Sequence, residues 1–133
     1  MADEAVTIEL YNGGRPIRYL VADATAIPKG SLLELDADMR VIVATNTDKC
    51  FVGVAAAEKV ASDGSTYMSA YTDGIFDMKS DAGTDVRGAA MMISDATNTL
   101  ETCDAGGLLS GGYVGYYLES GTNAGTEAVR VNK

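Results

Sequence analysis

The side chains that most often carry catalysis are scarce in this chain. It has no histidine, so neither a Ser-His nor a Cys-His dyad can form within its 133 residues. A mechanism based on paired carboxylates needs two acids that converge in one cleft. None of the 19 Asp and Glu residues stands at a spacing that indicates such a pair. These observations favour a protein that is not an enzyme.

Metal and phosphate sites are also not indicated. Asp36-Ala37-Asp38 resembles the start of a calcium loop, but the turn glycine and the bidentate Glu are missing at the required spacing. The glycine-rich segment 106–112 lacks a following Lys-Ser/Thr pair, so we interpret it as a flexible connection into the next strand. Cys50 and Cys103 fit no metal spacing, and we expect them to be reduced, semi-buried thiols. No metal and no cofactor is therefore expected.

Lys49 is the one position that suggests a covalent modification. The run from Thr47 to Cys50, followed by Phe51-Val52-Gly53-Val54, looks like the hairpin that carries lipoyl-lysine in pseudo-symmetric β domains. The chain is longer than such a domain, its flanking glycines are placed differently, and Cys50 stands where a small Ala is usual. We interpret Lys49 as an ordinary charge at a hairpin tip. A lipoyl-like carrier domain remains a distant third hypothesis for the function.

Three tyrosines, Tyr113, Tyr116 and Tyr117, lie in one short run. Neighbouring side chains of a strand point to opposite faces, so both faces of this segment carry an aromatic ring. A contact with a second sheet or a second subunit would use both rings, and so would burial in the chain's own core. These tyrosines are our candidate residues for a subunit interface.

The elements that must position these residues are predicted to be short strands. Apolar and polar residues alternate in runs of roughly four to eight, typical of half-buried strands. Asn12-Gly13, Asp63-Gly64 and Asp73-Gly74 are predicted turns between them. Only residues 55–61 have good helix propensity, and a helical turn or a strand ending in a loop would both fit there. The pattern predicts an all-β (mainly β) fold, a compact β-barrel or sandwich with at most one short helix.

The two halves of the chain share three blocks in the same order. The segment around Gly30 aligns with that around Gly88, at an offset of 58, and the segment from Phe51 aligns with that from Tyr113, at an offset of 62. Gly64 aligns with Gly125, at an offset of 61. We interpret this as two similar β units, about 16–76 and 77–131, that close one core together. A chance likeness of two β meanders is the alternative.

Length and charge limit the number of domains and the kinds of partner. The length predicts one β domain, spanning 15–133, after a separate segment 1–14. The net charge of −9 argues against a nucleic-acid partner, which requires clustered Lys and Arg. No window approaches about 18 uninterrupted apolar residues, so no membrane association is expected, and the first residues lack the basic region of a secretory signal.

Three segments together resemble a known family, the small capsid decoration (cement or head-stabilising) proteins of tailed double-stranded DNA viruses. They are the entry PKGSLLEL, a centre that combines Gly53-Val54-Ala55 with residues 72–76, and a close that combines residues 115–120 with Val129-Arg130-Val131. The resemblance covers about residues 16–131. It departs from the family at Tyr116-Tyr117, where small or aliphatic residues are usual.

The resemblance implies a β-barrel protein that forms a homotrimer on the outer capsid surface of a virion. Such a protein is made in the host cytoplasm and stabilises the mature head by bridging subunits of the major capsid protein. The alternative function is a small carbohydrate- or surface-binding β module, which would need a groove lined by Tyr113, Tyr116 and Tyr117.

Residues 1–14 lie outside the two similar units and contain one alternating run, Val6, Ile8 and Leu10. We hypothesise that this arm adds a strand to the sheet edge of a partner. Val6, Ile8 and Leu10 are therefore the candidate capsid contacts. An ordinary first strand of the domain's own sheet is the alternative.

Overall fold

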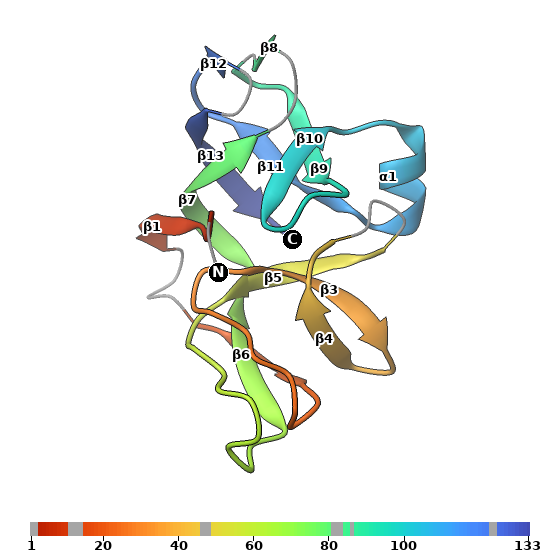
Figure 1. The fold of residues 1–133 in the computed structure, drawn as a ribbon. Helices are drawn as coiled ribbons and strands as arrows, with labels where there is room; N and C mark the ends of the chain where they lie inside the picture. Colours follow the sequence, from red (N-terminus) through yellow and green to blue (C-terminus); the bar gives the residue numbers. More distant parts are fainter. Residues whose placement is uncertain (1–2, 11–14, 46–48, 81–83, 86, 123–124) are drawn as a thin grey trace.

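Strands are the main regular structure of the described residues, as the alternating apolar pattern predicts. The computed structural model describes residues 3–10, 15–45, 49–80, 84–85, 87–122 and 125–133. Within these residues it has thirteen strands and one short helix, α1 (Ala105–Ser110) (Figure 1). The strands are β1 Val6–Leu10, β2 Ile17–Leu20, β3 Leu32–Ala37, β4 Arg40–Val43, β5 Phe51–Ala55, β6 Tyr67–Tyr71, β7 Asp73–Ser80, β8 Thr84–Asp85, β9 Ala90–Ile93, β10 Thr99–Thr102, β11 Tyr113–Tyr117, β12 Gly121–Thr122 and β13 Thr126–Asn132.

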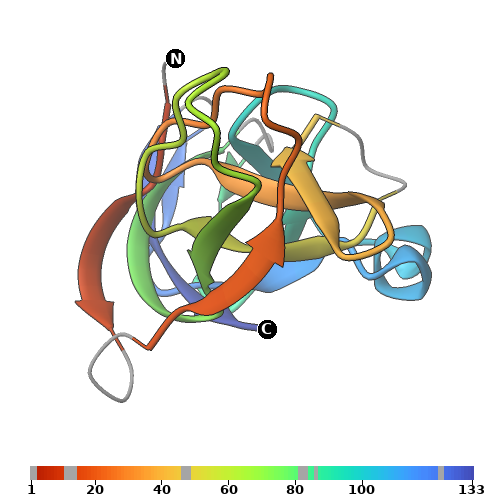
Figure 2. The ribbon, with the colours of Figure 1, turned by 90° about the horizontal axis from the view of Figure 1, so that it is seen from below.

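Ten of the strands form two five-stranded barrels, one from each half of the chain (Figures 1 and 2). The first barrel has the order β2-β4-β3-β5-β6, and β2 pairs with β6 to close it. The second has the order β7-β10-β9-β11-β13, and the pairing of β7 with β13 closes it. The predicted all-β architecture of two similar units with at most one short helix is confirmed.

The two barrels have the same topology. In each, the ring order is first, third, second, fourth and fifth strand along the chain. In each, the first and third strands are parallel, as β2 with β4 and β7 with β10, and the other neighbours are antiparallel. The chain passes from one barrel to the other at Thr72, close to the division that the sequence suggested.

The strand registers also repeat. Leu33 lies opposite Gly53 in the first barrel, and Met91 lies opposite Gly115 in the second. In each of these two strand pairs, the register shifts next to this glycine, in the strand that carries it. The offsets along the chain are 58 for β3 and β9 and 62 for β5 and β11, the values that the sequence blocks predict. A bulge places an extra residue in one strand, and its repetition at one position identifies a duplicated unit.

Backbone hydrogen bonds outside the strand ladders repeat at the same offsets along the chain. The Ala55 N–H donates to the Ser31 carbonyl at 2.8 Å, and the Tyr117 N–H donates to the Ala89 carbonyl at 3.1 Å. We call two residues twins when they occupy equivalent positions in the two barrels. The offset between twins is 58 for β3 and β9, 62 for β5 and β11, and 59 for the other three pairs of strands.

The third sequence block was misplaced by two positions. Leu20 lies opposite Tyr67, and Lys79 lies opposite Thr126, so the offset between the last strands of the barrels is 59 and not 61. The sequence comparison aligns two loop glycines, Gly64 and Gly125. Turns favour glycine wherever the backbone requires it, so these glycines do not mark equivalent positions in the two barrels. Strand register, which those loops do not fix, decides the alignment.

The larger hydrophobic cluster joins the barrels. It contains the interior of the second barrel together with Leu32, Ala44, Phe51 and Val54 of the first barrel, all of which are buried. Figure 1 shows β3 and β5 lying directly beneath the second barrel. A smaller cluster fills the interior of the first barrel. The outer face of β3 and β5 therefore closes one end of the second barrel.

Helix α1 covers most of the glycine-rich segment 106–112 that we interpreted as a flexible connection, so that interpretation is wrong. The Asp104 carboxylate accepts from the Gly107 N–H at 2.7 Å, which caps the first turn. Gly111 follows the helix in the left-handed conformation, with φ of 81°. The two caps outweigh the poor helix propensity of Gly106 and Gly107.

Two other local expectations are resolved. Residues 55–61 are not helical; β5 ends at Ala55 and the chain continues into a loop. The turn predicted at Asp73-Gly74 is wrong, because both residues belong to β7, whose side chains alternate between half-buried and buried. Asp63-Gly64 is a turn with Gly64 at φ of 83°, whereas Asn12-Gly13 lies outside the described residues.

Candidate functional site

The described residues contain no cluster of three or more Cys, Asp or Glu side chains that could hold a metal ion. Asp36, a member of the possible calcium loop, instead pairs with Arg40, at 2.6 Å from Nη2. The described part of the chain also contains no helix with the length and hydrophobicity needed to cross a membrane.

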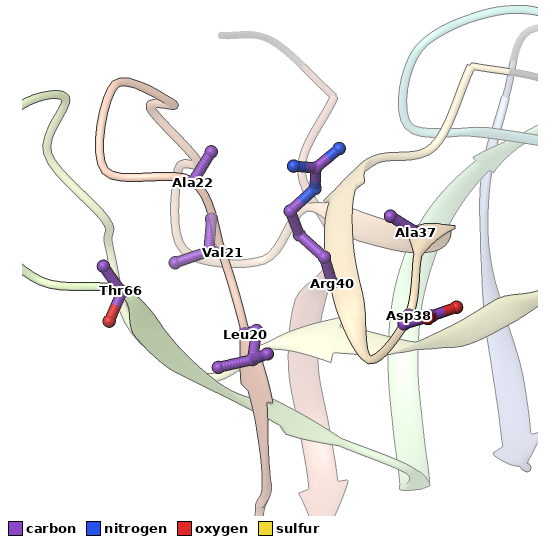
Figure 3. A pocket seen from close by; sticks show the side chains of 7 residues that line it. All are labelled: Leu20, Val21, Ala22, Ala37, Asp38, Arg40 and Thr66. Carbon is purple, nitrogen blue, oxygen red and sulfur yellow. The ribbon is translucent and has the colours of Figure 1, made fainter.

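An open crevice of about 570 Å³ lies at one end of the first barrel (Figure 3). It exists because β2 and β4 pair only where Leu20 meets Arg40 and then separate. Beyond that point the Val21 N–H donates to the Thr66 carbonyl at 2.9 Å, which turns the chain away from β4. The lining residues are Leu20, Val21, Ala22, Ala37, Asp38, Arg40 and Thr66.

The crevice offers little specific chemistry. Its walls are mainly aliphatic, and the guanidinium of Arg40 is already bonded to Asp36. None of its lining residues is aromatic, so it lacks the platform on which a sugar ring stacks. We assign no ligand to this crevice.

Lys59 is a buried cation that the sequence did not single out. Its side chain is 3% exposed, and its Nζ donates to the carbonyls of Asp23 and Val60 at 2.9 and 2.8 Å. The Asp63 carboxylate accepts a third bond at 2.8 Å. With all three donors of the ammonium group used, Lys59 holds two loops of the first barrel together. Its role is structural.

This arrangement predicts how stability depends on pH. The hydrogen bond from Lys59, followed by that from the Ser65 N–H, holds the pKa of Asp63 below its usual value. A depressed folded-state pKa contributes stability above the unfolded pKa of about 4, and this is lost as pH falls through the folded value. We expect Asp63→Asn to lower the urea midpoint at pH 7, with a difference from wild type that shrinks toward pH 3.

Asp38→Asn is the control for this measurement, because Asp38 is exposed and forms no ion pair among the described residues. Its difference from wild type should not vary with pH in the same way. A constant difference for Asp63→Asn between pH 7 and pH 3 would contradict the assignment.

The two thiols and Lys49 are the remaining candidates for a reactive side chain. Cys50 and Cys103 are half-buried and are not bonded to each other. Burial, and then the charge of Asp104, raises the pKa of Cys103 above its usual value, which disfavours the nucleophilic thiolate. Lys49 is exposed, but the expected hairpin is wrong, because β4 and β5 both pair with β3 and lie on opposite sides of it. Residues 47–48 of the lipoyl-like turn lie outside the described residues.

The candidate capsid contacts lie on β1, which pairs with β7 of the same chain as the end strand of its sheet. The structure therefore shows the alternative, a first strand of the domain's own sheet, and not an arm that is free to join the sheet of a partner. Val6 and Ile8 are 61% and 50% exposed. A register shift between Thr7 and Glu9 changes the alternation, so Leu10 is half-buried against the core. The structure therefore keeps Val6 and Ile8 on one exposed strip and directs Leu10 inward.

The candidate interface tyrosines divide between the two faces of β11. Tyr117 is 1% exposed and belongs to the core of the second barrel, together with Val114. Tyr113 and Tyr116 are half-buried on the opposite face. Val114 is the extra residue of the bulge, so it shares a face with Tyr117. Only Tyr113 and Tyr116 present part of their rings to the outside.

Searches of protein-family models and of curated protein sequences found no match to this chain.

Proposed function

We propose that this protein is a structural component of a virion. It binds the outer surface of a viral capsid as a homotrimer and stabilises the mature head by bridging major capsid subunits. The observation that carries the proposal is the exposed apolar strip of Val6 and Ile8 on the end strand β1. It adds to the resemblance that the sequence motifs carry.

The strip is unusual for a free surface. Proteins that remain alone in solution protect their end strands with charges, prolines or bulges, because an open strand edge pairs readily with another chain. β1 has such a bulge, at its register shift between Thr7 and Glu9, and Thr7 is exposed, but the two other exposed side chains, Val6 and Ile8, are aliphatic. A strand of a capsid protein that pairs with β1 would gain backbone hydrogen bonds and would cover both side chains.

The net charge and the proposed trimer fit this role. A net charge of −9 keeps free trimers soluble and disfavours non-specific association between them. Three copies that bind together gain avidity over one, so each contact can be modest. A protein that binds the mature shell but not its precursor stabilises the mature shell by mass action.

The test uses the purified full chain and heads of the encoding virus that lack it. We expect light scattering to give a particle with three times the 13.8 kDa mass of one chain, and co-sedimentation to show saturable binding to mature heads. Binding that is absent at the highest soluble concentration would exclude the proposed function.

A further inference from the structure

The face of the first barrel that covers the second barrel has a twin on the second barrel. That first face contains Leu32 of β3, Ala44, and Phe51 and Val54 of β5, each at most 2% exposed. Their twins, by the offsets above, are Ala90 of β9, Cys103, and Tyr113 and Tyr116 of β11.

The twin residues form a coherent surface. Tyr116 lies opposite Ala90 in the ladder of β11 and β9, and the Cys103 N–H donates to the Ala90 carbonyl at 2.9 Å. Ala90 is exposed, and Cys103, Tyr113 and Tyr116 are half-buried. We call these four residues the donor face. It has the position of a barrel-covering face, but within the described part of this chain no barrel covers it.

The interior of the first barrel differs from that of the second at the equivalent end. Phe76, Met78 and Ile93 line the covered interior of the second barrel, each at most 1% exposed. Their twins in the first barrel are Ile17, Tyr19 and Leu35.

These twins are accessible. Ile17 is 49% exposed, and Tyr19 and Leu35 are half-buried against the interior of the first barrel. We call these three residues the acceptor end. The first barrel is therefore open where the second is closed by β3 and β5.

We infer that the donor face of one copy packs against the acceptor end of a second copy, repeating between chains the contact that joins the barrels within one chain. The two surfaces suit each other because the same fold already makes this contact once, with buried apolar residues on both sides. Each exposed residue has a twin that is buried there. This inference rests on the homotrimer of the proposed function and names the surfaces that build it.

A contact of this kind joins two different surfaces, so every copy has one of each and the assembly grows head to tail until it closes. Three copies would place six barrels in one ring. The tyrosines of the donor face add rigid aromatic area, which is enriched at interfaces.

Two single variants and their mixture test the inference. Ile17→Lys blocks the acceptor end and leaves the donor face intact, whereas Tyr116→Lys does the reverse. We expect light scattering to find each variant alone as a monomer of 13.8 kDa. Mixed in equal amounts, they should form one dimer with twice the monomer mass, because a single intact contact remains.

Val60→Lys is the matched control, because Val60 is 57% exposed and lies outside both surfaces. This variant should keep the wild-type mass. Variants that stay trimeric, a wild type that stays monomeric, or a mixture that stays monomeric would each overturn the inference. Binding of the wild type to heads is measured separately. If both variants remain trimeric and the wild type binds heads, only this inference is contradicted. If the mixture gives the expected dimer and the wild type does not bind heads, only the capsid binding of the proposed function is contradicted.

Discussion

A Gly115→Ala substitution is expected to destabilise the protein by at least about 3 kcal/mol, a large part of the roughly 5–15 kcal/mol that holds a domain of this size folded. A Cβ at this position would overlap the Arg130 carbonyl oxygen and would lie 2.8 Å from its carbon. These atoms belong to the backbone of β13, so no side-chain rotation relieves the clash. The strand that closes the second barrel on β7 would have to move.

The twin glycine provides an internal comparison. A Cβ at Gly53 would lie 2.6 Å from the Tyr71 carbonyl oxygen, in the backbone of β6, which is a milder clash than that at Gly115. We therefore expect Gly53→Ala to be destabilising as well, by less than Gly115→Ala. The reason is the same in both barrels, because β5 and β11 approach the closing strand more closely than a side chain permits.

Gly106→Ala is the control. A Cβ there would meet the Asp104 carboxylate at 3.3 Å, and alanine favours the helix more than glycine does. Urea unfolding followed by circular dichroism should rank the loss of stability as Gly115→Ala, then Gly53→Ala, then Gly106→Ala. Equal stability of Gly115→Ala and Gly106→Ala would mean that β11 and β13 lie farther apart than the structure has them.

Glycines also show why the fold class could be predicted from the sequence. Strand alternation reflects the burial of one face of each strand, whereas the repeated spacing around Gly30 and Gly88 reflects a backbone geometry that few other residues allow. The two glycines have φ of 86° and 85°, and each donates its N–H to the carbonyl of a twin residue, Ala55 or Tyr117. Because this constraint acts on a single residue, it is visible in the sequence as a glycine, and the repetition of that glycine indicates the duplication.

The candidate surfaces were harder to predict, because alternation does not say what covers a strand. Val6 and Ile8 alternate in the same way whether β1 pairs with its own sheet or with a partner. Tyr116 and Tyr117 point to opposite faces, as neighbours in a strand do, but the bulge at Val114 decides which of the two rings lies inside. Lysine is normally exposed, and one of the three hydrogen-bond partners that hold Lys59 in its buried position, the Asp23 carbonyl, is 36 residues away in the sequence.

The exposed strip of β1 gives the second large effect. A Val6→Lys/Ile8→Lys double variant is expected to lose at least about 30-fold in affinity for capsid heads, because charges would replace the apolar side chains at the centre of the proposed contact. Folding should change little, since both side chains are at least half exposed and surface substitutions usually cost within about 0.5 kcal/mol. Lysine also discourages pairing at a strand edge.

A matched Met39→Lys/Val60→Lys variant separates this local effect from the change in net charge. Both of its side chains are exposed, at 63% and 57%, and both lie on the first barrel away from β1. Each double variant makes the chain less acidic by the same amount, so any general electrostatic attraction to the shell changes equally. Co-sedimentation with mature heads should then show weak binding for the β1 variant alone. Similar binding by the two variants would remove β1 from the capsid contact and leave the trimer surfaces unaffected.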